Sequence, residues 1–268
     1  MSSALIDNGK FLITNHNMEV HHHPQVEKKS FKEYFLEFIM IFLAVTLGFI
    51  AENIREGFAE HRQQQEYILS FYEDLKTDTA KISGVIGFDQ KKIDAFGTLA
   101  GCYDSVSKNI MSASCMLNFI KNSTTDLPFQ ITDRTLKQLA NAGGYRLLKK
   151  EDADKITEYQ SAFNLLQDFQ ATVFQETQDN VRNTYNQVVN FKANVLMKQS
   201  KPGSGLDFSD KDITTTLLFS NDKVLLNKYF NELLLYNRIT ISHQRQLNVL
   251  KQEQIALIDY FKNKYHFE

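Results

Sequence analysis

An apolar stretch, YFLEFIMIFLAVTLGFIA (residues 34–51), contains a single charged residue, Glu37. Beyond Glu37 it is apolar on nearly every side of a helix, whereas a buried helix of a soluble protein usually keeps a polar face. As a helix it would span roughly 27 Å, enough for a thin bilayer core. The stretch therefore predicts a transmembrane helix, extending over residues 31–52.

A cleaved signal peptide also has an apolar stretch after basic residues. This stretch begins more than thirty residues into the chain, and Phe49 stands where a small residue should precede a cut after Ala51. An uncleaved signal anchor is therefore favoured. More basic residues precede the stretch than follow it at a similar distance: Lys28, Lys29 and Lys32 against Arg55 and Arg62.

The lysine bias places the amino terminus in the cytoplasm by the positive-inside rule. No second apolar run of comparable length follows, so we expect one crossing of the inner (cytoplasmic) membrane, with residues 53–268 in the periplasm. Residues 1–30 are expected to form a short disordered tail. The run His21–His23 is a poor metal site there, because adjacent residues on a flexible tail rarely complete a coordination shell. Met18 is a candidate true start, since residues 1–17 carry no recognisable motif.

The composition excludes intrinsic disorder for most of the chain, because 43% of the 268 residues are hydrophobic and 23% are charged. Only 3 Pro and 11 Gly are present, which favours long helices over a many-stranded sheet protein. The formal net charge of -2 gives no basic footprint for nucleic acid.

Helical periodicity continues after the apolar stretch. We predict long helices over residues 51–82, 87–121, 150–198 and 226–261, and a short helix over 133–141 that ends at two glycines. The clearest break is Pro202–Gly205. Because each long helix must bury an apolar stripe, the sequence predicts an all-α protein in which one transmembrane helix continues into an antiparallel bundle.

The expected core includes three stripes of residues at helical spacing. The first contains Ala51, Ile54, Phe58, His61, Gln65, Ile68, Tyr72, Leu75, Thr79 and Ile82. The second contains Ile156, Tyr159, Phe163, Leu166, Phe169, Val173, Val181, Val188, Phe191 and Val195. The third contains Leu226, Tyr229, Leu233, Tyr236, Thr240, His243, Leu247, Leu250, Gln254, Leu257 and Phe261.

The two cysteines have two interpretations, and so do the two histidines on stripe positions. In one straight helix Cys102 and Cys115 would lie roughly 20 Å apart, beyond disulfide reach, so two small buried hydrophobic side chains are favoured. A helix break near residues 112–114 would instead let them pair in an oxidising periplasm. His61 and His243 both fall on stripe positions, where ordinary core histidines are favoured over a facing metal or pH-sensitive pair.

No catalytic motif is present in the sequence. It has no Walker loop, dinucleotide fingerprint, nucleophile elbow or HExxH pair, and no Glu-x-x-His pair at helical spacing. We therefore predict no enzyme activity, no cofactor and no metal site.

Two distinctive runs of sequence are EVHHHPQVEKKSFKEYFLEFIMIFLAVTLGFIAENIRE (residues 19–56) and TLKQLANAGGYRLLKKEDADKITEY (residues 135–159). They resemble an uncharacterised family of single-pass membrane proteins common in Bacteroidota, and the resemblance covers most of the chain from Met18 onward. The resemblance implies an inner-membrane protein with a helical periplasmic domain. It also supports Met18 as the natural start of the chain. It implies no reaction, ligand or named partner.

Two features of the apolar stretch bear on mechanism. Ala44 and Gly48 form a small-xxx-small pair, which permits close approach of a second helix and hence transmembrane self-association into a homo-oligomer. Glu37 lies a turn inside the apolar boundary, where an ionised carboxylate is costly unless it snorkels or is paired. Neutralisation by Lys29 or Lys32 is favoured over a proton-linked or subunit-pairing role.

Three classes of function remain. A membrane-anchored interaction, sensor or scaffold protein that docks an envelope protein is favoured, because the helices are polar-rich and a catalytic set is absent. The alternative is an oligomeric membrane effector whose transmembrane helices form a pore. An enzyme with a site assembled across helices ranks last.

Overall fold

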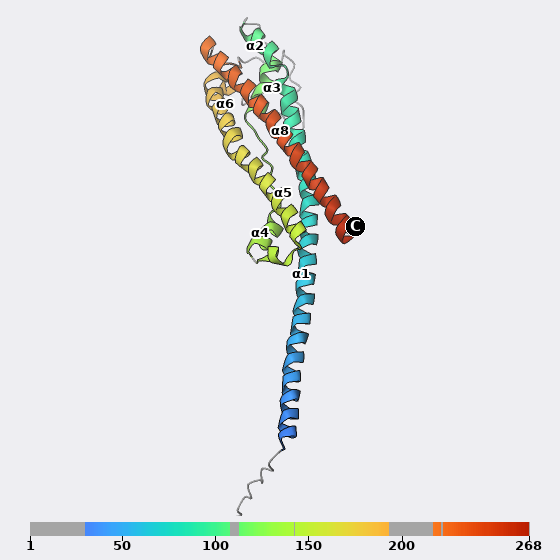
Figure 1. Ribbon diagram of the computed structural model, residues 1–268. Helices are drawn as coiled ribbons and strands as arrows, with labels where there is room; N and C mark the ends of the chain where they lie inside the picture. Colours follow the sequence, from blue (N-terminus) through green and yellow to red (C-terminus); the bar gives the residue numbers. More distant parts are fainter. Residues whose placement is uncertain (1–29, 108–112, 142, 193–216, 221, 268) are drawn as a thin grey trace, which may run out of the picture. The chain divides into compact units, whose positions relative to one another are not determined.

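The computed structural model describes residues 30–107, 113–141, 143–192, 217–220 and 222–267. The predicted tail, with its histidines and Met18, lies outside the described residues, as do Val195 and the break at Pro202–Gly205. The elements are α1 (Phe31–Phe96), α2 (Leu99–Ser107), α3 (Ala113–Ser123), α4 (Arg134–Asn141), the 3-10 helix η1 (Gly144–Leu147), α5 (Lys150–Phe169), the π-helix η2 (Gln170–Phe174), α6 (Gln175–Val188) and α8 (Lys223–Tyr265) (Figure 1).

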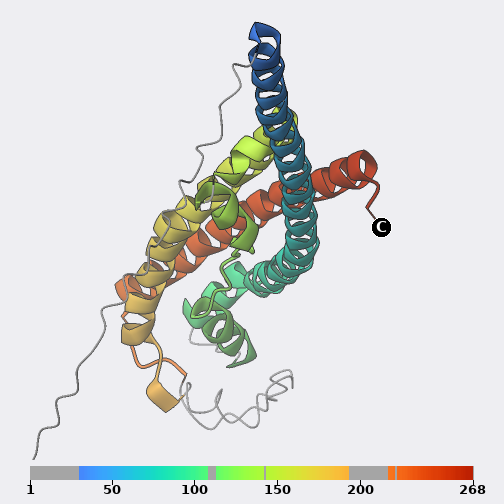
Figure 2. The same cartoon turned by 90° about the horizontal axis from the view of Figure 1, so that it is seen from below.

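The chain divides into two compact units, Met1–Glu56 and Gly57–Glu268. Within the second unit, α8 packs along α5, η2 and α6 and runs antiparallel to them (Figures 1 and 2). The predicted all-α bundle is confirmed. Its strand content in the described part is one isolated bridge, between Val189 and Leu218.

The third predicted stripe is confirmed throughout, because every one of its residues is buried on α8. The helix begins at a capping residue, Asp222, whose side chain accepts hydrogen bonds from the backbone N–H groups of Val224 and Leu225. Such a cap satisfies donors that the first turn leaves without partners. The helix ends where His266 adopts a left-handed conformation with φ of 57°.

The predicted boundary between the first and second long helices is wrong. α1 continues through Gly84 and Gly87 to Phe96, and the predicted second helix is divided into the end of α1, α2 and α3. A Cβ atom at either glycine would meet nothing within 4 Å, so neither is required by a turn or a close contact. Each glycine destabilises a helix interior by about 1 kcal/mol relative to alanine, and the packing of α1 outweighs that cost.

The first stripe is buried only in its second half. Ile68, Tyr72, Leu75 and Ile82 are in the core, whereas the earlier members are exposed and form a helical stalk: Ala51, Ile54, Phe58, His61 and Gln65.

The second stripe shifts register at η2. A π-turn adds one residue to the helix, so Gln170 and Phe174 are buried while Val173 is 41% exposed. The helix also ends at Val188, ten residues before the predicted Lys198, and Phe191 is 76% exposed. Val173 and Phe191 are therefore not core residues.

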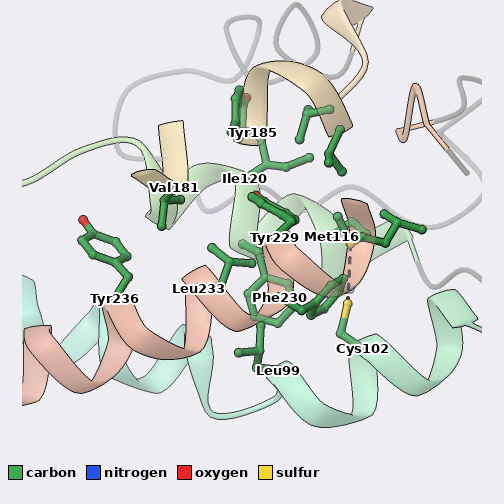
Figure 3. Close-up of a cluster of buried hydrophobic side chains, with 14 of the residues drawn as sticks. Leu99, Cys102, Met116, Ile120, Val181, Tyr185, Tyr229, Phe230, Leu233 and Tyr236 are labelled. Carbon is green, nitrogen blue, oxygen red and sulfur yellow. Dashed lines mark hydrogen bonds between the residues drawn. The ribbon is translucent and has the colours of Figure 1, made fainter. Parts of the chain in front are cut away.

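The buried side chains form two hydrophobic clusters. The α3 cluster joins the end of α1 to α2, α3, α6 and the first half of α8, and includes Met116, Phe119, Val181 and Leu233 (Figure 3). The α4 cluster joins α1 to α4, α5 and the second half of α8, and includes Ile68.

Cys102 and Cys115 form a disulfide, with Cα atoms 5.8 Å apart. The favoured interpretation of two unpaired buried cysteines is thus wrong, because the two residues belong to separate helices, α2 and α3, and not to one straight helix. Cys102 is also buried against Met116 in the α3 cluster (Figure 3).

We expect that thiol titration of the denatured, unreduced protein will detect no free thiol. Replacing both cysteines (Cys102→Ser with Cys115→Ser) should lower the free energy of unfolding by about 3 kcal/mol, because the unfolded chain gains conformational entropy when the cross-link is removed. Two titratable thiols in protein isolated from its native membrane would contradict the pairing.

Candidate functional site: a buried polar layer

Five polar residues at the boundary between the two hydrophobic clusters, together with Tyr236 of the α3 cluster, are called the polar layer: Asp89, Lys92, Asp126, Gln170 and His243. Asp89 and Lys92 follow the α4 cluster along α1 and precede Phe96 of the α3 cluster. Tyr236 and His243 have the equivalent place on α8, and Gln170 has it on η2. The layer therefore joins α1, α8 and the short η2 at one level of the bundle.

His243 is the centre of the layer. Its Nδ1 lies 2.7 Å from Oδ2 of Asp89, and its Nε2 lies 3.0 Å from Oε1 of Gln170. The side chains of His243 and Asp89 are 0% and 1% exposed. The imidazole also stacks on Phe174, with ring centroids 4.6 Å apart. The ring is thus fixed by both nitrogens and by one face.

The hydrogen bonds of Gln170 determine the proton positions on His243. Gln170 Oε1 accepts from the Phe129 N–H at 2.7 Å, and its Nε2 donates to the Phe129 carbonyl at 3.2 Å. Oε1 is therefore an acceptor toward His243, so Nε2 of the imidazole carries hydrogen. A second hydrogen bond joins Nδ1 to the Asp89 carboxyl group.

Lys92 is the second centre. Its Nζ donates to the Thr125 carbonyl at 2.7 Å and to Oη of Tyr236 at 2.6 Å, and it forms an ion pair with Asp126. Tyr236 in turn donates to Asp126. Burial lowers the pKa of Lys92, and the Asp126 carboxylate opposes that effect. Burial, reinforced by Asp126, raises the pKa of Tyr236.

The layer links α1 to α8 through two hydrogen bonds, from His243 to Asp89 and from Lys92 to Tyr236. His243 and Asp89 have the arrangement of a base with an orienting carboxylate, but the third partner is an amide, which is not a nucleophile. A register shift of α1 against α8 would separate Asp89 from His243 and Lys92 from Tyr236. Buried polar contacts of this kind specify one helix alignment.

The sequence-predicted site residues do not meet at the polar layer. Ala44 and Gly48 lie exposed on α1, one turn apart, and Glu37 is exposed on the same helix. His61 is exposed and contacts Gln65, so it is not the core histidine that its stripe position predicts and does not face the buried His243. Among the described residues, no cluster of three or more His, Cys, Asp or Glu side chains is placed to hold a metal ion.

A second polar cluster fastens the end of α8 to the start of α5. Asp152 accepts hydrogen bonds from Lys264 at 2.7 Å, from Tyr260 at 2.7 Å and from Tyr265 at 2.6 Å. Burial would raise the pKa of Asp152, but these three donors together hold it below its ordinary value.

The lowered pKa of Asp152 predicts a pH dependence of stability. A carboxylate with a lower pKa in the folded state stabilises the fold above its unfolded pKa of about 3.9, and that stabilisation is lost as the pH falls through the folded value. Asp152→Asn should cost about 2 kcal/mol at pH 7. In urea titrations the difference from wild type should narrow in acid, and a constant difference would contradict this assignment.

No protein-family model, curated protein or solved structure matches the chain.

Proposed function

We propose that the protein is a single-pass inner-membrane protein whose periplasmic helical unit binds another envelope protein and catalyses no reaction. One observation carries the membrane part of the proposal. An 18-residue window of α1 has a mean hydropathy of 2.2 and is 0% buried. In a soluble protein, other elements would cover the apolar surface of a core helix. An exposed apolar surface of this size marks a contact with a membrane or with another protein.

Two further observations support an uncleaved anchor with its carboxy-terminal unit outside the cytoplasm. α1 remains helical through Ala51 and on to Phe96, so the bond after Ala51 lies within a helix and not in the extended chain that a peptidase needs. The Cys102–Cys115 disulfide belongs to the unit that we place in the periplasm. Disulfides persist in that oxidising compartment and are rare in the cytosol.

The interaction role is supported by the character of the polar layer. Its charged groups are buried and mutually paired, which suits a rigid helical platform and gives no reacting group access to a substrate.

Cross-linking in intact native membranes, followed by purification of the chain, tests this role. We expect a defined envelope protein to be recovered with the full chain, and to be absent when the chain is truncated after Glu56 and only the anchor remains. Recovery of the same proteins with both forms, or of none with either, would contradict an interaction role for the helical unit.

The alternative, a pore-forming oligomer, rests on Ala44 and Gly48. A Cβ at Gly48 meets nothing within 4 Å, so Gly48→Ile fits the isolated helix and obstructs only a second one. In a membrane two-hybrid assay of residues 31–56, Gly48→Ile should weaken self-association if this face is the contact, whereas the matched control Leu43→Ile should not. Equal signals for wild type and Gly48→Ile would remove this contact and most of the case for a pore.

A further inference from the structure

The outward face of α8 is unusually apolar. A bundle helix normally presents polar residues opposite its buried stripe. On α8 five exposed apolar side chains flank the line opposite the buried stripe: Leu234 at 40%, Leu235 at 49%, Ile241 at 36%, Val249 at 57% and Ile255 at 36%. We call this set, with the two arginines described next, the α8 outer face.

Arg238 and Arg245 lie along the middle of the α8 outer face. At about 100° per residue they are opposite the buried stripe, with the apolar side chains on both sides of them. They are seven residues apart, which is two turns or roughly 10.5 Å. Within the described residues, neither guanidinium has an ion pair or a side-chain hydrogen bond, whereas Arg55, Arg134 and Arg182 each pair with a carboxylate.

An apolar groove adjoins this face. It has a volume of about 200 Å³ and lies between α2 and α8, lined by Leu99, Ala100, Tyr103, Phe230 and Leu234. Leu234 belongs to both the groove and the α8 outer face, so the two form one continuous surface. The groove can accept a large apolar side chain from a helix that lies along α8.

We propose that the α8 outer face binds an amphipathic helix of a different envelope protein, one that presents two carboxylates about one heptad apart. Its carboxylates would pair with Arg238 and Arg245, and an apolar residue near its end would fill the groove, as in helix-in-groove recognition. Interfaces are rich in arginine flanked by apolar side chains. The inference deepens the proposed function, since it names the surface and the partner's chemistry.

A second copy of the chain is a poorer occupant. In a two-fold contact centred on this face the same patch meets itself, so the arginines of one copy would face those of the other. Such like-charge contacts in an interface cost several kcal/mol. Charge complementarity therefore favours an acidic partner over a homodimer.

The test uses the full chain in its native membranes, with a photo-crosslinking amino acid at Leu235 or at Val249. The control position is Leu165, which is 71% exposed on α5 and lies away from α8's outer face. We expect one adduct of discrete mass from each α8 position and none of that mass from Leu165. The charge-reversed chain, Arg238→Glu with Arg245→Glu, should lose the adduct by about tenfold or more.

Two further variants separate loss of charge from loss of folding. Arg146→Glu with Lys150→Glu changes charge equally at two exposed positions and should leave the adduct unchanged. Arg238→Gln with Arg245→Gln should weaken it while the circular dichroism melt stays that of wild type. Once the adduct is sequenced, reversal of the partner's two acidic residues to lysine should restore crosslinking to the charge-reversed chain.

The contradicting outcomes are distinct. An adduct at twice the chain's mass would show that a second copy occupies the face. A crosslink within one chain would show that another part of the same chain covers it. An adduct insensitive to charge reversal would exclude the carboxylate contact. No adduct from either α8 position would also overturn the proposal. If the chain then still resists extraction by alkali, the membrane anchor stands and only this surface assignment fails.

Discussion

His243→Ala should lower the free energy of unfolding by about 3–5 kcal/mol, because it leaves the carboxylate of Asp89 buried without its partner. The imidazole also fills space between Phe174 and Gln170, so its loss opens a cavity next to η2. Urea denaturation followed by far-ultraviolet circular dichroism measures this cost on the purified chain.

A double-mutant cycle separates the pair from the cavity. Asp89→Leu with His243→Leu replaces both partners with apolar groups, so it should cost less than the sum of the two single Leu variants. Additive single and double costs, or a His243→Ala cost under about 1 kcal/mol, would show that the Asp89–His243 bond does not hold the layer together.

The double variant Leu43→Arg with Leu47→Arg should abolish stable membrane integration. These residues are 49% and 62% exposed in the apolar span, and each arginine near the bilayer centre costs about 2.5–3.5 kcal/mol. After alkaline extraction of membranes, the wild-type chain should remain in the pellet and the variant should be found in the soluble fraction or be degraded.

The matched control carries the same two arginines at exposed apolar positions of the helical unit, Leu165→Arg with Val173→Arg. It should behave as wild type in the extraction. If the Leu43 and Leu47 variant also stayed in the pellet, the apolar span would not be what holds the chain in the membrane.

The stripe of α8 was readable from sequence because one unbroken rhythm of threes and fours runs from Leu226 to Phe261. Even its polar members, Thr240, His243 and Gln254, are buried where the rhythm puts them. Burial of polar side chains at such positions requires partners, and the partners come from elements distant in the chain. The rhythm thus predicts position but not the bonds that His243 makes.

Asp89 and Lys92 were missed although the same signal could have found them. Continuing the first stripe past Ile82 gives Val85, Asp89, Lys92 and Phe96, and all of these are buried. The expected first helix stops at Ile82, before Gly84 and Gly87, whereas tertiary packing carries α1 through both glycines despite their low helix propensity.

Gln170 and the disulfide could not be read from local pattern. The π-turn at η2 shifts the buried face by one residue, and no residue type in the segment 170–174 predicts that turn. The pairing of Cys102 with Cys115 depends on how α2 and α3 pack against each other, which is a tertiary property.

The most direct test of the proposed topology uses a reporter enzyme that is active only outside the cytoplasm. Fused after Glu268 it should be active, because we place the helical unit in the periplasm, and fused before Met18 it should be silent. An active reporter before Met18 together with a silent one after Glu268 would reverse the orientation and contradict the account of a periplasmic interaction protein.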